Sequence, residues 1–193
     1  MTDARHLVLD LASTSKNWAI TPEAEACVRA AAPPGWRVSS VGAPTSSDGD
    51  GPQGASAEAL PLIGDAEVYF GFGITADLFA AAPRLRWVHS AAAGVGNVLS
   101  SGIGDSDVLL TNSAGIHGAP IAEFVVAGVL FFLRGLDVAV EQQRRSEWDK
   151  AFFVAVESPL REVADCRVLI VGTGGLGGEA ARRLAALGAT CIG

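Results

Sequence analysis

The residues best suited to chemistry are the glycines of segment 171–178, which reads Val-Gly-Thr-Gly-Gly-Leu-Gly-Gly. Gly172, Gly174 and Gly177 have the spacing Gly-x-Gly-x-x-Gly, and they follow a five-residue apolar run and open a helical pattern over 176–187. In a dinucleotide site the first glycine permits a tight turn, the second lets the backbone approach a diphosphate, and the third lets helix and strand pack closely. The spacing therefore predicts a phosphate-binding turn.

The helix that follows this turn would supply the binding groups. The first N–H groups of a helix have no partner within it and lie at the positive end of its dipole. We expect those of Gly175 and Leu176 to face the phosphate oxygens. A strand–helix turn that binds nothing is the alternative interpretation of the same residues.

The acidic residue that holds the ribose hydroxyls in such sites is expected about 20 residues further on. The next strand begins near Ala189, and the sequence stops at Gly193. One strand–helix unit does not form the sheet on which a dinucleotide lies, so we expect the chain to be cut within this domain, before the residue that separates NAD from NADP.

The elements that must position these residues alternate along the chain, which favours an α/β fold with a parallel sheet and helices on both faces. The segment 42–57, rich in Gly, Pro, Ser and Asp, is assigned no structure, and 151–164 is expected to be irregular. Apolar runs predict strands over 7–11, 36–41, 68–72, 85–89, 108–112 and 167–171, and helical patterns cover 22–32, 57–63, 76–82, 119–148 and 176–187.

The helical pattern over 119–148 is the longest, apolar in its first half and polar in its second. A helix apolar on all sides must be covered on all sides, so we expect it to lie between a domain and something else, such as a second subunit. It divides the chain into a first domain, 1–113, and a second, 114–193.

Composition excludes several classes of protein. The 193 residues are 49% hydrophobic and 18% charged, with a net charge of −7, so a disordered chain or a partner such as nucleic acid or an anionic membrane is not expected. Three cysteines are too few and too scattered for a disulfide framework or a zinc site, so we expect no metal and a cytoplasmic location. The most apolar stretch, 124–133, is half as long as a membrane span.

Three segments together resemble the D-isomer-specific 2-hydroxyacid dehydrogenases, in the branch of the glyoxylate/hydroxypyruvate reductases. They are 85–95 (Leu-Arg-Trp-Val-His-Ser-Ala-Ala-Ala-Gly-Val), 111–124 (Thr-Asn-Ser-Ala-Gly-Ile-His-Gly-Ala-Pro-Ile-Ala-Glu-Phe) and 168–181 with its glycine turn. The second is the most specific, because its asparagine, glycine and Ala-Glu pair keep the spacing of the family. The resemblance covers most of residues 60–193.

The resemblance implies an oxidoreductase that transfers hydride between nicotinamide and a small 2-hydroxy or 2-oxo acid. Residues 1–113 would form a flavodoxin-like substrate domain lacking its completing segment, and 114–193 the homodimer-forming helix (119–148) and the first half of a Rossmann domain. NAD or NADP would lie on Gly172, Gly174, Gly175, Leu176 and Gly177. The backbone N–H groups of Ala93 and Gly94 would bind the substrate carboxylate, although a plain small-residue turn would look the same.

The chain also departs from the family. Gly96 stands where the family often has Asp. The Arg that binds the 2-oxo acid, and the Glu and His that move the proton, have no counterpart among the 193 residues, so no catalytic residue is assigned and the isolated chain is expected to be inactive. His6, His89 and His117 are interpreted as structural or, for His117, as a helix cap or cleft residue. Glu123 is interpreted as a first-turn carboxylate, and Asp10 has no evident partner.

Three other interpretations remain. The segment 168–187 also resembles the nucleotide loop of adenylating enzymes that activate ubiquitin-like carrier proteins, although the segment 112–124 argues against them. A methyltransferase is less favoured because the strand 167–171 has no acidic residue. A nucleotide-binding or dimerising remnant without turnover is compatible with an intact parent enzyme.

Overall fold

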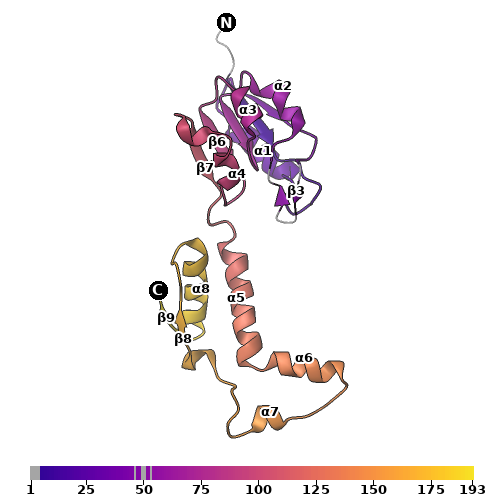
Figure 1. Cartoon of the computed structure of the whole chain (residues 1–193), viewed down its shortest axis with the longest axis vertical. Helices are drawn as coiled ribbons and strands as arrows, with labels where there is room; N and C mark the ends of the chain where they lie inside the picture. The colour runs from indigo at the N-terminus through magenta and orange to yellow at the C-terminus, as the bar shows by residue number, and fades with distance from the viewer. Residues whose placement is uncertain (1–4, 46, 49–50, 53) are drawn as a thin grey trace. The chain divides into compact units, whose positions relative to one another are not determined.

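The structure is a computed structural model that describes residues 5–45, 47–48, 51–52 and 54–193. The chain folds as two compact units, Met1–Ala114 and Gly115–Gly193 (Figure 1). Each unit has its own sheet and its own cluster of buried hydrophobic side chains. The expected α/β class with a parallel sheet is confirmed. The designation of the units as substrate domain and dinucleotide-binding domain stays a prediction.

The first unit is built on a five-stranded sheet of order β2-β1-β5-β6-β7, in which every neighbouring pair is parallel. In chain order these strands are 2-1-3-4-5, the flavodoxin-like order. The chain therefore reverses its direction of travel across the sheet after β2. The strands are β1 (His6–Asp10), β2 (Arg37–Ser40), β5 (Val68–Gly71), β6 (Trp87–Ser90) and β7 (Leu109–Asn112).

The helices predicted for this unit begin at the expected places, whereas the short helices α4 and η2 were not expected. In α1 (Pro22–Ala31), the side chain of Thr21 accepts a hydrogen bond from the N–H of Ala24, and proline occupies the first turn, as the sequence predicts. The remaining helices are short: η1 (Ala57–Ala59), α2 (Leu60–Ile63), α3 (Ala76–Ala80), α4 (Gly96–Leu99) and η2 (Ile103–Asp105).

The segment 42–57, to which the sequence assigns no structure, contains a small antiparallel pair, β3 (Ser47–Asp48) and β4 (Gly51–Pro52). Residues 46, 49–50 and 53 of this segment lie outside the described residues. The expectation was wrong because backbone pairing needs no apolar side chains, and apolar periodicity was the signal used for strands.

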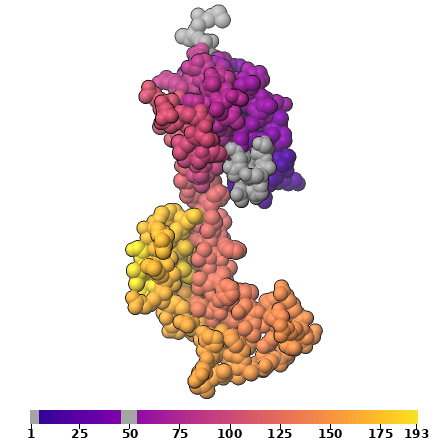
Figure 2. Space-filling view, in the orientation of Figure 1, coloured from indigo at the N-terminus to yellow at the C-terminus, as the bar shows by residue number. Residues whose placement is uncertain are grey.

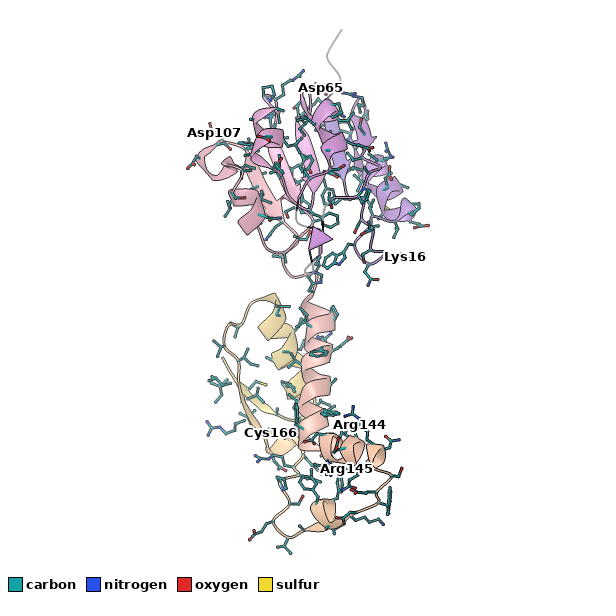
Figure 3. All side chains as sticks on the ribbon, turned by 45° about the vertical axis from the view of Figure 1, so that its right-hand side comes forward. Lys16, Asp65, Asp107, Arg144, Arg145 and Cys166 are labelled. Atoms are coloured by element: carbon teal, nitrogen blue, oxygen red, sulfur yellow. The ribbon has the colours of Figure 1, made fainter. Side chains whose placement is uncertain are left out.

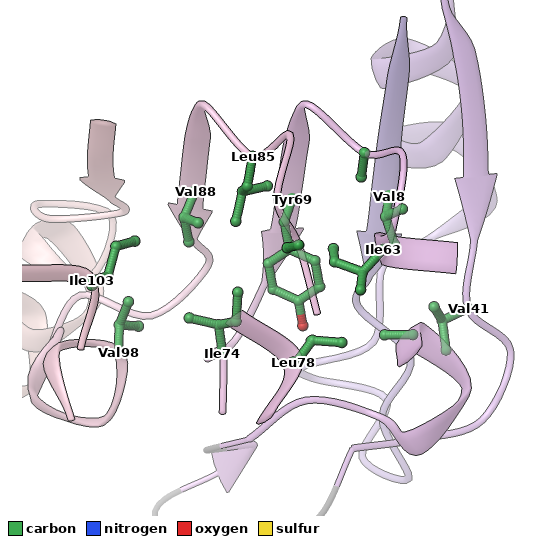
Figure 4. Close-up of a cluster of buried hydrophobic side chains, with 13 residues drawn as sticks. Val8, Val41, Ile63, Tyr69, Ile74, Leu78, Leu85, Val88, Val98 and Ile103 are labelled. Carbon is green, nitrogen blue, oxygen red and sulfur yellow. The ribbon is translucent and has the colours of Figure 1, made fainter. Parts of the chain in front are cut away.

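The handedness of the connections decides which face of the sheet becomes the core. Right-handed crossovers place α1 on one face, because it precedes the reversal, and the later helices on the other. Side chains of α2, α3 and α4 pack there against Val8, Tyr69 and Val88, all buried (Figure 4). On the α1 side a groove of about 810 Å³ runs over the strands, and Trp87 and Leu109 in its lining are 41% and 58% exposed.

The second unit pairs two helices side by side. Its helices are α5 (Gly118–Leu133), α6 (Leu136–Arg144), α7 (Ala151–Val154), η3 (Val163–Asp165) and α8 (Gly175–Ala186), and its strands β8 (Arg167–Leu169) and β9 (Thr190–Ile192) are parallel. Leu184 of α8, 1% exposed, packs with Val163 and with Val126, Val129 and Leu130 of α5.

The single helix expected over 119–148 is wrong, because the chain breaks at Gly135. This glycine has φ +64°, a left-handed conformation that side chains disfavour. A Cβ there would also lie 2.9 Å from atoms of Leu160 and Phe152. Beyond the break, α6 and α7 lie apart from α8, at the far end of α5 (Figures 1 and 2). Arg145, at the end of α6, pairs with Glu141 at 2.7 Å (Figure 3).

The strand expected to be buried over 167–171 is shorter and more exposed than the sequence suggests. β8 ends at Leu169, which is 73% exposed, and Val171 is 93% exposed. Within the described residues β8 pairs with β9 alone, so much of its apolar surface faces solvent. The helices described include none long and apolar enough to cross a membrane.

Two positions of α2 test the assignment of the core. Ile63 is fully buried, whereas Leu60 in the same helix is 52% exposed. Ile63→Ala should lower the free energy of unfolding of the first unit by about 2–5 kcal/mol, because it removes buried methyl groups and leaves a cavity. Leu60→Ala should change it by less than about 1 kcal/mol. Denaturant unfolding measures both; equal effects would contradict the core described here.

Candidate functional site

The glycine turn joins β8 to α8 with the geometry that its spacing predicts. Gly172 has φ +90°, a conformation that a side chain strongly disfavours. Gly174 occupies the N-cap of α8 in an extended conformation. The backbone therefore reverses within the two residues between Gly172 and the start of the helix.

The second and third glycines differ in what surrounds them. A Cβ at Gly174 would meet no atom within 4 Å, so the missing side chain leaves open space beside the helix start. A Cβ at Gly177 would overlap the carbonyl oxygen of Gly172 and lie 2.9 Å from Cγ2 of Ile170. Gly174 thus leaves room for a ligand, whereas Gly177 allows the helix to pack against the turn.

The helix start offers donors to that open space. α8 begins without a side-chain cap, because Gly174 has no side chain to accept from its first turn. The N–H groups of Gly175, Leu176 and Gly177 belong to this turn, and Gly175 and Leu176 are exposed. Uncapped donors at the positive end of a 12-residue helix suit an anion, so the turn fits a diphosphate.

A second helix begins beside the turn, which the sequence did not reveal. A Cβ at Gly118, the first residue of α5, would lie 2.9 Å from the carbonyl oxygen of Gly175, and one at Gly175 would lie 3.2 Å from Cα of Gly115. Further along, Arg183 of α8 lies 3.6 Å from Glu123 of α5, so the two helices run in the same direction. Gly115 and Gly118 belong to the segment 111–124 that resembles the family, and their contact with the turn was not predicted from the sequence.

In the first unit, the loop after β6 holds the two residues expected to bind a carboxylate. Ala93 and Gly94 are both exposed, and a Cβ at Gly94 would meet no atom within 4 Å. Within the described part of the chain, their N–H groups donate to no protein acceptor. Gly96, where the family often has Asp, is the first residue of α4.

Contacts to the end of β7 fix this loop. The side-chain amide of Asn112 donates to the carbonyl oxygen of Ala93 at 2.6 Å, and the backbone N–H of Ser113 donates to the carbonyl oxygen of Ala92 at 3.2 Å. The N–H of Ala92 in turn donates to Oγ of Ser90 at 3.3 Å. Sequence reasoning used Asn112 as a family marker and gave it no role.

His89 lies in the groove, with both ring nitrogens engaged. Nε2 lies 3.3 Å from Oγ of Ser113, whose proton is donated to the carbonyl of Ser90, so Nε2 is the donor. Nδ1 then accepts from Oγ1 of Thr111 at 2.8 Å, and this oxygen accepts from Nε1 of Trp87. The bonds describe a neutral imidazole, and burial lowers the pKa of His89.

The remaining candidates have structural surroundings. Asp10, expected to have no evident partner, accepts at Oδ2 from Tyr69 and from the N–H of Ser56, both at 2.7 Å, so that expectation was wrong. Burial raises the pKa of this carboxyl. His6 is fully buried between Asp65 and Ser39.

His117 directly precedes α5, and Glu123 lies in the second turn of this helix, whose first turn has no acidic residue, so the expectation of a first-turn carboxylate at Glu123 was wrong. His117 occupies the N-cap of α5, but its side chain makes no cap hydrogen bond, so the expected capping role was wrong. The carboxylate of Glu123 is instead near Arg183.

Gly177 provides a test of the turn that does not depend on a ligand. Gly177→Ala should disrupt the second unit, because its methyl group would overlap the Gly172 carbonyl, whereas Gly174→Ala should fold normally. Overpacking of this kind destabilises by about 1–3 kcal/mol or more. Thermal unfolding followed at amides of α8 measures the difference. Equal stability of the two variants would mean that helix and turn do not pack as described.

The pKa of His89 predicts a pH dependence. Its folded-state pKa lies below the value of about 6.5 for an unfolded chain, so the unfolded state binds the proton more readily. The contribution of His89 to the free energy of unfolding of the first unit should be complete above about pH 6.5 and should be lost as the pH falls through the folded-state pKa. Titration of the ring by NMR should give a pKa below 6.5, and His89→Gln should weaken the slope. A pKa above 6.5 would contradict this arrangement.

No known protein-family model matches the chain. A curated relative, the (S)-sulfolactate dehydrogenase of Chromohalobacter salexigens, is 26% identical over 112 residues, which are 58% of this chain and 35% of that protein. The chain thus spans about a third of the length of this relative.

Solved structures match almost the whole chain. A D-isomer specific 2-hydroxyacid dehydrogenase family protein from Aeromonas salmonicida has a TM-score of 0.64 and 25% identity, over 98% of this chain and 53% of that one. An NADPH-dependent glyoxylate/hydroxypyruvate reductase from Sinorhizobium meliloti, in complex with NADP and sulfate, has a TM-score of 0.64 and 28% identity, over 98% and 52%. The chain spans about half the length of these structures. In sequence and fold it is similar to the D-isomer-specific 2-hydroxyacid dehydrogenases, glyoxylate/hydroxypyruvate reductases among them, as the sequence predicts.

Proposed function

We propose that this chain carries the cofactor turn and the substrate-carboxylate loop of an NAD(P)-dependent oxidoreductase of the D-2-hydroxyacid dehydrogenase type. The observation that carries the proposal is the glycine turn: Gly172 with φ +90°, open space at Gly174 and close packing at Gly177 are what a diphosphate site requires. When bound, the nicotinamide would exchange a hydride with C2 of a small 2-hydroxy or 2-oxo acid.

In this proposal the second unit is the dinucleotide-binding domain. Gly172, Gly174, Gly175, Leu176 and Gly177 hold the diphosphate of NAD or NADP. The similarity to an NADP complex of a reductase supports this cofactor class. The uncapped N–H groups of α8 supply the attraction and Gly174 the room.

The first unit is then the substrate domain. The N–H groups of Ala93 and Gly94 bind the carboxylate of the acid, and this role is supported by their exposure and by the lack of an acceptor for them among the described residues. Small side chains at both positions let a carboxylate approach the backbone. The acid itself is of the glyoxylate or hydroxypyruvate size class.

Assembly as a homodimer is part of the proposal. Ile121, Phe124 and Phe132 of α5 are 42%, 79% and 68% exposed, on a helix whose other side packs against α8. Exposed apolar side chains gathered on one helix favour burial against a second copy. The surface is formed by α5 and α6 rather than by one helix over 119–148. The free thiols Cys27, Cys166 and Cys191 suit the cytoplasm.

We also propose that the isolated chain does not turn over. The resemblance places the Arg, Glu and His of the reaction on segments with no counterpart among these residues, and the rings of His6 and His89 are held by structural hydrogen bonds. The chain would bind cofactor weakly and leave the proton of the 2-hydroxyl without an acceptor.

The test is whether the full 193-residue chain binds NADH. Saturation-transfer NMR measures this binding, because it detects weak complexes. Wild type should show transfer to the adenosine and ribose protons. Gly174→Val should abolish it, since a branched side chain would fill the space of the diphosphate. Gly64→Val is the matched control, because a Cβ there also meets no atom within 4 Å, but in the first unit.

Two outcomes would contradict the proposal. Binding that survives Gly174→Val would show that the turn is not the cofactor site. Oxidation of NADH with glyoxylate or hydroxypyruvate by the isolated chain would show that the residues present suffice for the proton transfer.

A further inference from the structure

The orientation of the two carboxylate-binding amides is set by contacts on the opposite side of the same peptide groups. In a trans peptide the C=O of one residue and the N–H of the next point in opposite directions. The described chain contains no cis peptide bond. The carbonyl of Ala93 therefore fixes the N–H of Gly94, and the carbonyl of Ala92 fixes the N–H of Ala93.

Both of these carbonyls are held by the end of β7. Asn112 donates its side-chain N–H to the oxygen of Ala93 at 2.6 Å, and Ser113 donates its backbone N–H to the oxygen of Ala92 at 3.2 Å. Two successive carbonyls directed toward one element are not the alternating pattern of an extended strand. Their two N–H groups must then point together, away from β7.

The result is a pair of neighbouring donors on one side of the loop. Successive backbone N–H groups turned to the same side form a concavity suited to an anion. Ala93 and Gly94 are exposed, and a Cβ at Gly94 would meet no atom within 4 Å. Asn112 lies behind the donors and does not compete with the ligand.

We infer that Asn112 is a positioning residue for the carboxylate of the 2-oxo acid: its hydrogen bond to Ala93 turns the N–H of Gly94 toward the substrate. This inference rests on the proposed function, because it concerns the same loop. Ser113 contributes through its backbone, so a side-chain substitution there leaves its bond in place. Asn112 is thus the position at which the orientation can be changed by mutation.

The chemistry of the side chain explains why an amide is needed at this position. The Ala93 carbonyl needs a donor, which an asparagine NH₂ group supplies and an aspartate, acceptor-only when ionised, does not. Asn112→Asp keeps the shape of the side chain, but it replaces the hydrogen bond by repulsion between a carboxylate oxygen and the carbonyl oxygen of Ala93. The Ala93–Gly94 peptide would then rotate, and one of the two donors would leave the site.

A first experiment measures the hydrogen bond in the wild-type chain, with no substitution. NMR should detect a scalar coupling across the bond from the Asn112 side-chain nitrogen to the Ala93 carbonyl carbon. Addition of oxamate, a stable mimic of a 2-oxo acid, should shift the backbone amide signals of Ala93 and Gly94. Absence of the coupling in the free protein would overturn the inference, whatever the ligand does.

The second experiment compares variants by the same titration. Asn112→Asp and Asn112→Ala should raise the dissociation constant for oxamate at least tenfold. Asn17→Asp, at an exposed position, is the control for the added charge and should stay within twofold of wild type. The melting temperature of the first unit and the response of the Gly172–Gly177 amides to NADH should not change.

The outcomes separate the inference from the proposed function. Oxamate binding by Asn112→Asp that equals wild type overturns the positioning role and leaves the carboxylate loop intact. If oxamate does not shift the Ala93 and Gly94 amide signals of the wild-type chain, both the loop assignment and the inference are overturned. Failure of NADH to bind at the glycine turn is a separate result that refutes the cofactor assignment alone. If Asn112→Asp unfolds, the wild-type coupling and the Asn112→Ala titration still decide.

Discussion

The direction of backbone N–H groups is the constraint on which both candidate sites depend. At the start of α8 the donors are available because Gly174 offers no side-chain cap and Gly177 lets the helix meet the turn without a Cβ between them. In the loop after β6 the donors are available because two carbonyls are held from behind by the end of β7. A main chain fixed in this way provides anion sites that need no charged side chain.

The sequence predicts the parts of this arrangement that local spacing determines. The glycine turn was recognised because each glycine has a separate steric reason, and most strands of the five-stranded sheet because they are short apolar runs. The contact of Gly118 with Gly175 and the bond from Asn112 to Ala93 were not predicted, since each joins residues far apart in sequence. Gly135 was missed for another reason: one glycine leaves helical periodicity intact, and packing against Phe152 and Leu160 decides that the helix ends there.

The burial pattern shows a similar division between local and global information. The run 167–171 is as apolar as β1, yet Leu169 is 73% exposed whereas Leu9 is 1% exposed. The difference lies in what pairs and packs beside each strand: β1 has a parallel neighbour on both sides, β8 on one. Likewise, Trp87 and Val88 are neighbours in β6 and lie on opposite faces of the sheet. The right-handed crossovers place the later helices over the face of Val88, so Val88 is in the core and Trp87 lines a groove.

The net charge of −7 is compatible with binding of anions at these two places, because the forces act over different distances. Repulsion between the whole protein and a carboxylate or diphosphate is screened beyond about 10 Å in 0.1 M salt. The N–H groups act at hydrogen-bond distance, where the local dipoles outweigh the distant charges. Binding that depends on such dipoles is sensitive to the direction of each peptide and only weakly sensitive to surface charge. Substitutions that rotate one peptide should therefore matter more for this protein than those that change its net charge by several units.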